Sequence, residues 1–174
     1  MEQYLTPVIR PLVASDFKMI IAFFDQMSER TNMLFNRNQC NRNGILACFD
    51  PEQYGKYAFG IRRNFIATSP TETGEEIAGL VFAWDLDTMT PSIGICVAEH
   101  WKGRHLGRRL INHIIQYCFD LGKGGIFLST NVDNVEGQGL YRSSGFRQIG
   151  TTQSGELLFF LSRPTSPPVE DGTI

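Results

Sequence analysis

Glycines and basic residues that could bind an anion are concentrated in residues 102–109 of this 174-residue chain. The segment follows a β-branched run at residues 93–98 and precedes apolar positions that recur at helical spacing over residues 106–121. A helix that starts here has unpaired N–H groups in its first turn, and its dipole stabilises an anion by ~0.3–1 kcal/mol. Gly103 and Gly107 would let a phosphate approach the backbone. Four cations accompany them: Lys102, Arg104, Arg108 and Arg109. The pattern predicts a phosphate-binding turn.

The spacing of these glycines matches neither of two common phosphate-binding motifs. The segment contains no G-x-x-x-x-G-K-[ST] and no dinucleotide-type G-x-G-x-x-G. We therefore expect a different pyrophosphate. A glycine-containing turn followed by a solvated basic helix face is the alternative interpretation, and the spacing alone leaves it open.

A second group of residues follows the strand expected at residues 125–131. It consists of Asn134, Tyr141 and the pair Gly145 and Phe146. A short helix with a packed tyrosine and a glycine C-cap accounts for Gly145 equally well. It does not account for both groups in this order along the chain.

Together the two groups resemble the signature of the GNAT superfamily of acyl-CoA N-acyltransferases. Residues 102–107 match the register of its [R/Q]-x-x-G-x-[G/A] motif, with Lys102 where Arg or Gln is usual and His105 where Gly is usual. Residues 134–146 match N-x-x-A-x-x-x-Y-x-x-x-G-F, with Gly137 where Ala is common. The resemblance implies acetyl-CoA as co-substrate, no metal, and coenzyme contacts from Val97, Lys102, Gly103, Arg104, His105, Leu106, Gly107, Arg108, Asn131 and Asn134.

The resemblance also implies direct attack of an amine on the thioester, with the oxyanion held by a strand N–H near Val97 and Tyr141 protonating the departing thiolate. A phenol near pKa ~10 can protonate a thiolate near ~8.5 at a cost of roughly 2 kcal/mol. Relatives often carry a carboxylate early on the strand at residues 91–97, but no acid is present there. Asp85, Asp87 and Glu99 are the nearest substitutes, although each is also typical of a solvated turn. Asp85 is the candidate base.

The acceptor is expected to be a primary amine of a small molecule or peptide. Residues 29–60 interleave asparagines with Arg37 and Arg42 and then carry several aromatics, including Tyr54. This composition fits either a substrate-recognition flap or a loop-rich pair of short helices. A catalytically weak acyl-CoA-binding sensor or interaction module of the same fold is the alternative function.

Composition excludes several other classes of protein. The net charge is −2 with 20% charged residues, which argues against a nucleic-acid or membrane-surface partner. The four cysteines show neither C-x-x-C spacing nor zinc-finger histidines. The first residues lack the pattern of a signal peptide, and no apolar run approaches membrane-spanning length. We expect a reduced, cytoplasmic protein, and a homodimer stays open.

The order of expected elements predicts one GNAT-like domain over residues 1–163 and a flexible tail over residues 164–174. Strands are expected at residues 8–10, 64–69, 77–86, 93–98, 125–131, 146–151 and 157–162, and a first helix from Ser15 and Asp16 towards Met27. By its resemblance the fold is α/β (α+β). It has a mixed, mostly antiparallel twisted sheet of about seven strands, flanking helices and a splayed strand pair for coenzyme A.

Overall fold

Seven strands form a single sheet in the computed structural model, which describes residues 6–35, 40–50 and 61–165. They are β1 (Val8–Pro11), β2 (Arg63–Thr71), β3 (Gly74–Trp84), β4 (Ser92–Val97), β5 (Gly125–Thr130), β6 (Arg147–Thr151) and β7 (Leu157–Ser162). Their order across the sheet is β1-β2-β3-β4-β5-β7-β6. All neighbours are antiparallel except β4 and β5, which are parallel. The predicted mixed, mostly antiparallel sheet is confirmed.

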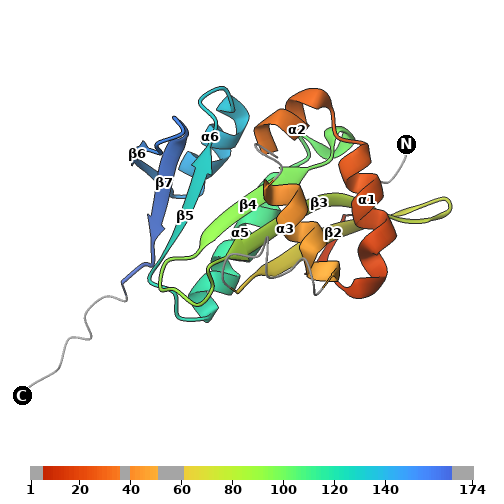
Figure 1. Ribbon diagram of the computed structural model, residues 1–174, viewed down its shortest axis with the longest axis horizontal. Helices are drawn as coiled ribbons and strands as arrows, with labels where there is room; N and C mark the ends of the chain where they lie inside the picture. The colour runs from red at the N-terminus through yellow and green to blue at the C-terminus, as the bar shows by residue number, and fades with distance from the viewer. Residues whose placement is uncertain (1–5, 36–39, 51–60, 166–174) are drawn as a thin grey trace, which may run out of the picture.

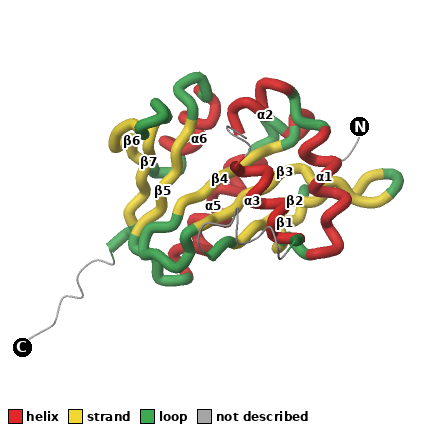
Figure 2. Tube along the Cα trace, in the orientation of Figure 1, coloured by secondary structure: helices red, strands yellow, loops and turns green. Residues whose placement is uncertain are grey.

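Helices cover both faces of this sheet (Figures 1 and 2). One core contains side chains of α1 (Phe17–Asp25), α2 (Glu29–Phe35) and α3 (Cys40–Leu46). The other contains side chains of α5 (Leu106–Asp120) and α6 (Val135–Ser143). In the described part of the chain, three short 3-10 turns connect these elements: η1 (Ala14–Asp16), η3 (Ala47–Phe49) and η4 (Glu99–Trp101). We call the two sides the α2 face and the α5 face.

The alternation of side chains along the central strand β3 builds the two cores. Leu80 and Phe82 are fully buried on the α2 face, whereas Val81 and Ala83 are fully buried on the α5 face. On α5 the buried positions are Leu106, Leu110, Ile111, Ile114 and Cys118, which follow the predicted helical spacing. Burial of each large aliphatic side chain stabilises the fold by about 1.5–3 kcal/mol.

Two expected elements have different lengths in the structure. The first helix is preceded by η1, begins at Phe17 and ends at Asp25. The β2–β3 hairpin is longer than predicted, because its ladder continues through polar residues to the pair Thr71 and Gly74. Hydrophobic patterning underestimates such strands, since backbone hydrogen bonds extend them beyond the buried part of the sheet. Of the expected tail, residues 166–174 lie outside the described residues.

Strands β4 and β5 separate along their length. Their ladder consists of the pair Ser92 and Phe127, where the Phe127 N–H donates to the Pro91 carbonyl at 2.9 Å. Beyond it, β5, β6, β7 and α6 diverge from the rest of the molecule (Figure 1). The predicted splayed pair is thereby confirmed.

Candidate active site

A cavity of about 1170 Å³ lies where β4 and β5 diverge. Its walls come from α2, β4, the turn before α5, the end of β5, the start of α6 and the β6–β7 turn. The cavity therefore brings together both groups of residues that the sequence singled out, although they are separated along the chain.

The open edge of β4 carries backbone hydrogen-bonding groups into this cavity. The Ala98 N–H donates to the Ala78 carbonyl at 2.9 Å, and β4 pairs with β3 in register from Ser92 to Val97. In an antiparallel ladder alternate residues turn their N–H and C=O groups to opposite sides. Those of Ile95 and Val97 therefore point away from β3, towards the gap. An extended ligand could pair with this edge as an added strand does.

The turn before α5 has the backbone of a glycine-rich anion site. Gly103 has φ +73° and His105 has φ +61°, so both lie in the left-handed region. This conformation costs roughly 1–2 kcal/mol for a residue with a Cβ, which explains why glycine is usual at position 105 of the motif. His105 is the N-cap of α5, and its side chain makes no cap hydrogen bond. The N–H groups of the first turn, beginning at Leu106, are therefore available to an anion.

The four cations of this segment do not converge on one point. Lys102 and Arg108 line the cavity, whereas Arg104 and Arg109 are not among its lining residues. The Lys102 Nζ atom lies 2.8 Å from Glu99 Oε2 and 2.7 Å from Thr31 Oγ1. Arg108 donates to the Ser143 carbonyl at 2.6 Å, Arg104 lies over the Trp101 ring, and Arg109 donates to the Pro7 carbonyl at 2.8 Å. Backbone amides are thus the more direct anion-binding groups here.

Glu99 joins α2 to the turn. Its carboxylate accepts hydrogen bonds from the hydroxyls of Ser28, at 2.5 Å, and Thr31, in addition to the ion pair with Lys102. Burial raises the pKa of Glu99, but the hydrogen bonds from Lys102, Ser28 and Thr31 outweigh it and lower the pKa to about 2. A carboxylate held this strongly in its ionised form is a poor proton acceptor near neutral pH.

Tyr141 and Asn134 meet at the end of β5. Tyr141 is 7% exposed, and burial raises the pKa of its phenol to about 12, with a smaller opposing effect from a hydrogen bond to Thr130. The Asn134 Nδ2 group donates to Thr130 Oγ1 at 2.8 Å, while its Oδ1 accepts from the Gly137 N–H at 3.1 Å and caps α6. The phenol is therefore neutral at physiological pH and can donate a proton.

Besides Arg104, two predicted site residues lie outside the cavity lining. Asp85 follows β3 at the end where β4 and β5 are still paired, and it is not among the residues that line the cavity. Burial, together with Asp87, raises its pKa. Asn131 is also not among the lining residues, and its side chain accepts from the Asp133 N–H at 2.9 Å.

Sequence reasoning missed Ser129 and Glu156, which line the cavity from β5 and from the residue before β7. No motif singles them out, because their proximity depends on the β5–β7 register. The expected acceptor segment is only partly described. Arg30, Leu34, Phe35 and Asn41 line the cavity, whereas Arg37 and Tyr54 lie outside the described residues.

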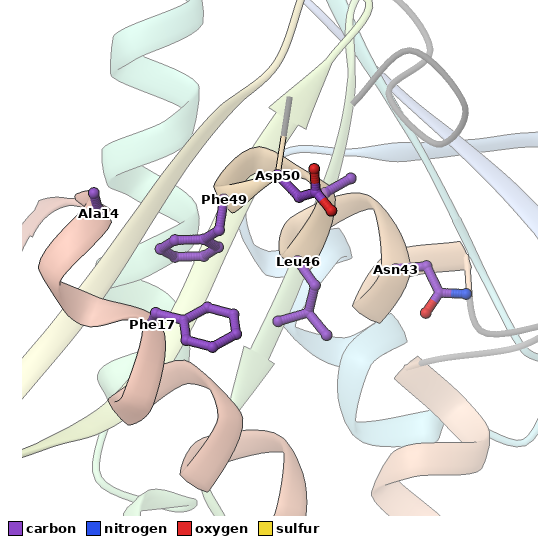
Figure 3. A pocket seen from close by; sticks show the side chains of 7 residues that line it. Ala14, Phe17, Asn43, Leu46, Phe49 and Asp50 are labelled. Atoms are coloured by element: carbon purple, nitrogen blue, oxygen red, sulfur yellow. The ribbon is translucent and has the colours of Figure 1, made fainter. Parts of the chain in front are cut away.

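A second cavity, of about 710 Å³, lies between α1 and the α3–η3 segment (Figure 3). Phe17 and Phe49 meet edge to face across it, with ring centroids 5.3 Å apart. Asp50 is the only titratable residue among its described lining. It offers neither a motif residue nor an open strand edge, so the β4–β5 cavity is the candidate active site.

Within the described ranges, no cluster of three His, Cys, Asp or Glu side chains is arranged to hold a metal ion. The same residues include no helix that is long and apolar enough to span a bilayer.

Residues 35–146 match the family model described as Acetyltransferase (GNAT) family, which is more than half of the chain. The chain belongs to the GNAT family and is an acetyl-CoA-dependent N-acetyltransferase of that family.

Solved structures share the fold. A ribosomal-protein-S5-alanine acetyltransferase from Vibrio fischeri has a TM-score of 0.71 at 15% identity, over 92% of this chain and 94% of that one. A spermidine N-acetyltransferase from Vibrio cholerae, in complex with CoA and spermine, has a TM-score of 0.67 at 16% identity, over 90% and 95%. PaiA N-acetyltransferase from Thermoplasma acidophilum, in complex with coenzyme A, has a TM-score of 0.68 at 12% identity, over 91% and 100%. No curated protein matches the sequence.

Proposed function

We propose that this chain transfers an acetyl group from acetyl-CoA to a primary amine of a small molecule or peptide, by direct attack in the β4–β5 cavity. The observation that carries the proposal is the arrangement of three features around one cavity: the open edge of β4, the uncapped start of α5 and the buried phenol of Tyr141.

The coenzyme fits the two backbone features. The N–H and C=O groups of Val97 are placed to pair with the pantetheine amides. The pyrophosphate would lie at the N–H groups that follow Gly103 and His105, where Leu106 and Gly107 begin α5. A Cβ at position 107 would lie 3.3 Å from Leu140 Cδ2 and 3.8 Å from Val97 Cγ2, so a side chain here would have to displace Leu140 slightly and would narrow the cavity.

Side chains around the turn and on the opposite wall complete the coenzyme site. Lys102 and Arg108 border the same part of the cavity, and Arg104 adds positive charge beside it. In this proposal Asn134 contacts the coenzyme from α6, and Asn131 acts from the turn before it.

Bound acetyl-CoA supplies a thioester carbonyl and a thiol leaving group. A strand N–H near Val97, on the edge of β4 that the β3–β4 ladder leaves open, would stabilise negative charge on that carbonyl oxygen. The Tyr141 hydroxyl donates its proton to the departing sulfur. Attack by the amine needs no covalent enzyme intermediate.

The acceptor approaches from the α2 face. Leu34 and Phe35 of α2 and Trp84 at the end of β3 give this side of the cavity an apolar wall, and Arg30 lies beside them. Apolar walls with a few polar groups are typical of small-molecule sites. The relatives named for spermidine and for a ribosomal-protein alanine show that the fold serves both small amines and protein amines.

Two measurements on the full chain test the proposal. Titration calorimetry with acetyl-CoA should show binding at one site per chain. Thiol release should then depend on an added amine from a panel of amino acids, polyamines, aminoglycoside-type amines and peptides. Binding without thiol release on any amine would instead support the acyl-CoA sensor.

A further inference from the structure

The proposed reaction needs a group that accepts a proton from the amine. An alkyl ammonium with a pKa near ~10.4 has only about one molecule in 2500 as free amine at pH 7. Three carboxylates line the cavity among the described residues: Glu99, Glu136 and Glu156.

Two of these carboxylates are unsuited to the task. Glu99 accepts three hydrogen bonds, one of them from the Lys102 ammonium. Glu136 lies in the first turn of α6, and its side chain is exposed. The positive end of that helix stabilises its ionised form.

Glu156 lies on the face from which the acceptor approaches. Along β5, Leu128 belongs to the α5-face core and Thr130, two residues on, is also buried on that side of the strand, so Ser129 between them points to the α2 face. The Ser129 hydroxyl donates to Glu156 Oε2 at 3.1 Å, and the pair Thr130 and Leu157 fixes the register of the two strands. This hydrogen bond directs the Glu156 carboxylate to the end of β5, next to the residue that hydrogen-bonds the Tyr141 phenol.

We propose that Glu156, held by Ser129, accepts the proton of the acceptor ammonium. The inference rests on the function proposed above. Glu156 takes one proton from the ammonium and becomes a neutral acid. The amine nitrogen forms its bond to the carbonyl carbon as the C–S bond breaks, Tyr141 protonates the sulfur, and the remaining excess proton on nitrogen returns to the phenolate. Glu156 then releases its proton to water, so the amide, the thiol and one proton balance the reaction.

The two faces of β5 keep these proton transfers apart. Thr130 places the proton donor for sulfur on the α5 face, and Ser129 places the proton acceptor for nitrogen on the α2 face. The arrangement also matches a reaction whose coenzyme and acceptor approach from opposite sides of the sheet.

The pH dependence of Glu156→Gln tests the assignment, with Glu136→Gln as a matched control from the same cavity. In Glu156→Gln, kcat/KM for the amine should fall by ~10³–10⁴-fold near pH 7 and then rise about tenfold per pH unit, as the free amine fraction does. The deficit should shrink to about 3-fold near the pKa of the amine. Wild type and Glu136→Gln should instead show a level kcat/KM across neutral pH, and all three proteins should bind acetyl-CoA equally by calorimetry.

Several outcomes would overturn the assignment. A deficit of equal size at every pH would make Glu156 a binding or structural residue, and an unchanged profile would remove it from the reaction. The same pH-dependent loss in Glu136→Gln would move the role to that residue. Amine-dependent thiol release by the wild-type protein establishes the proposed function in each of these cases. Its absence with every amine removes both proposals.

Discussion

Tyr141→Phe removes one hydroxyl from a buried ring with little change of volume. Burial raises the pKa of Tyr141 to about 12, so the phenol holds its proton across the whole working range of pH. Against a free thiol near ~8.5, proton transfer is uphill by about 3.5 units, or roughly 5 kcal/mol. Burial also raises the pKa of the departing thiol, so the pKa difference between the phenol and the thiol is smaller within the assembled site. The phenol is therefore a credible donor whose removal should slow the chemical step.

We expect kcat of Tyr141→Phe to fall by ~10–10³-fold, which corresponds to ~1.4–4 kcal/mol, with coenzyme affinity within about 2-fold of wild type. Amine-dependent thiol release measures the first quantity and calorimetry the second. Loss of the hydrogen bond with Thr130 should lower the free energy of unfolding by only about 1 kcal/mol. Tyr117→Phe, on α5 and outside the cavity lining, is the matched control and should keep full activity. A fully active Tyr141→Phe enzyme would remove Tyr141 from the mechanism.

Three further substitutions test the turn and its surroundings. Gly107→Glu places a negative charge at the start of α5 and should weaken acetyl-CoA binding by at least ~10-fold in calorimetry. The control Gly139→Glu, at a position where a Cβ meets open space, should leave the affinity unchanged. Equal affinities of the two variants would refute the pyrophosphate site. His105→Gly should raise the free energy of unfolding in denaturant by ~0.5–1 kcal/mol, because relief of left-handed strain exceeds the entropy cost of glycine. A loss of stability would show that the imidazole makes a contact worth more than this strain. The lowered pKa of Glu99 stabilises the fold above its ordinary value near 4.5, and this stabilisation is lost as pH falls towards about 2. Converted directly into free energy of unfolding, this pKa shift would be worth ~3 kcal/mol. Because the Glu99 side chain is 40% exposed, we expect a stabilisation of about 1 kcal/mol, which Glu99→Gln should lack. Parallel acid-unfolding curves for the two proteins would contradict this.

The fold could be predicted largely because its local signals agree with its tertiary structure. The apolar spacing of α5 reflects burial that the structure confirms, and in the β-branched run of β4 Ile93 is buried while Ile95 and Val97 are half-buried. The splayed pair was implied by the family resemblance rather than by any pattern of single residues. In the structure, β4 and β5 are joined by one ladder pair, Ser92 and Phe127, which are more than thirty residues apart in the chain. No local propensity encodes where a parallel ladder stops.

The candidate site was predicted less completely. The glycines of the turn were found because their backbone role leaves a sequence signal, and Gly103 does adopt a positive φ. The partners of Lys102 were not found, since Glu99 and Thr31 reach it from a neighbouring turn and from α2. Glu99 was considered as a base by its position after β4, but three donors hold it ionised. The number of basic residues in a sequence segment therefore overstates the number of cations that are available to bind a ligand.

The β5–β7 register decides which carboxylate can take part in the proposed reaction. Ser129 and Thr130 are neighbours in the chain, yet the pleat of the strand turns one to the acceptor side and the other to the coenzyme side. A shift of one residue would exchange the two faces, so that Glu156 would lose Ser129 and Tyr141 would lose Thr130. Asp85 is closer in sequence to β4 but lies at the paired end of the wedge, beyond the cavity. In this proposal the proximity of a carboxylate to the reacting amine follows from strand pairing, whereas a search for the base by distance along the chain points to the paired end of the sheet.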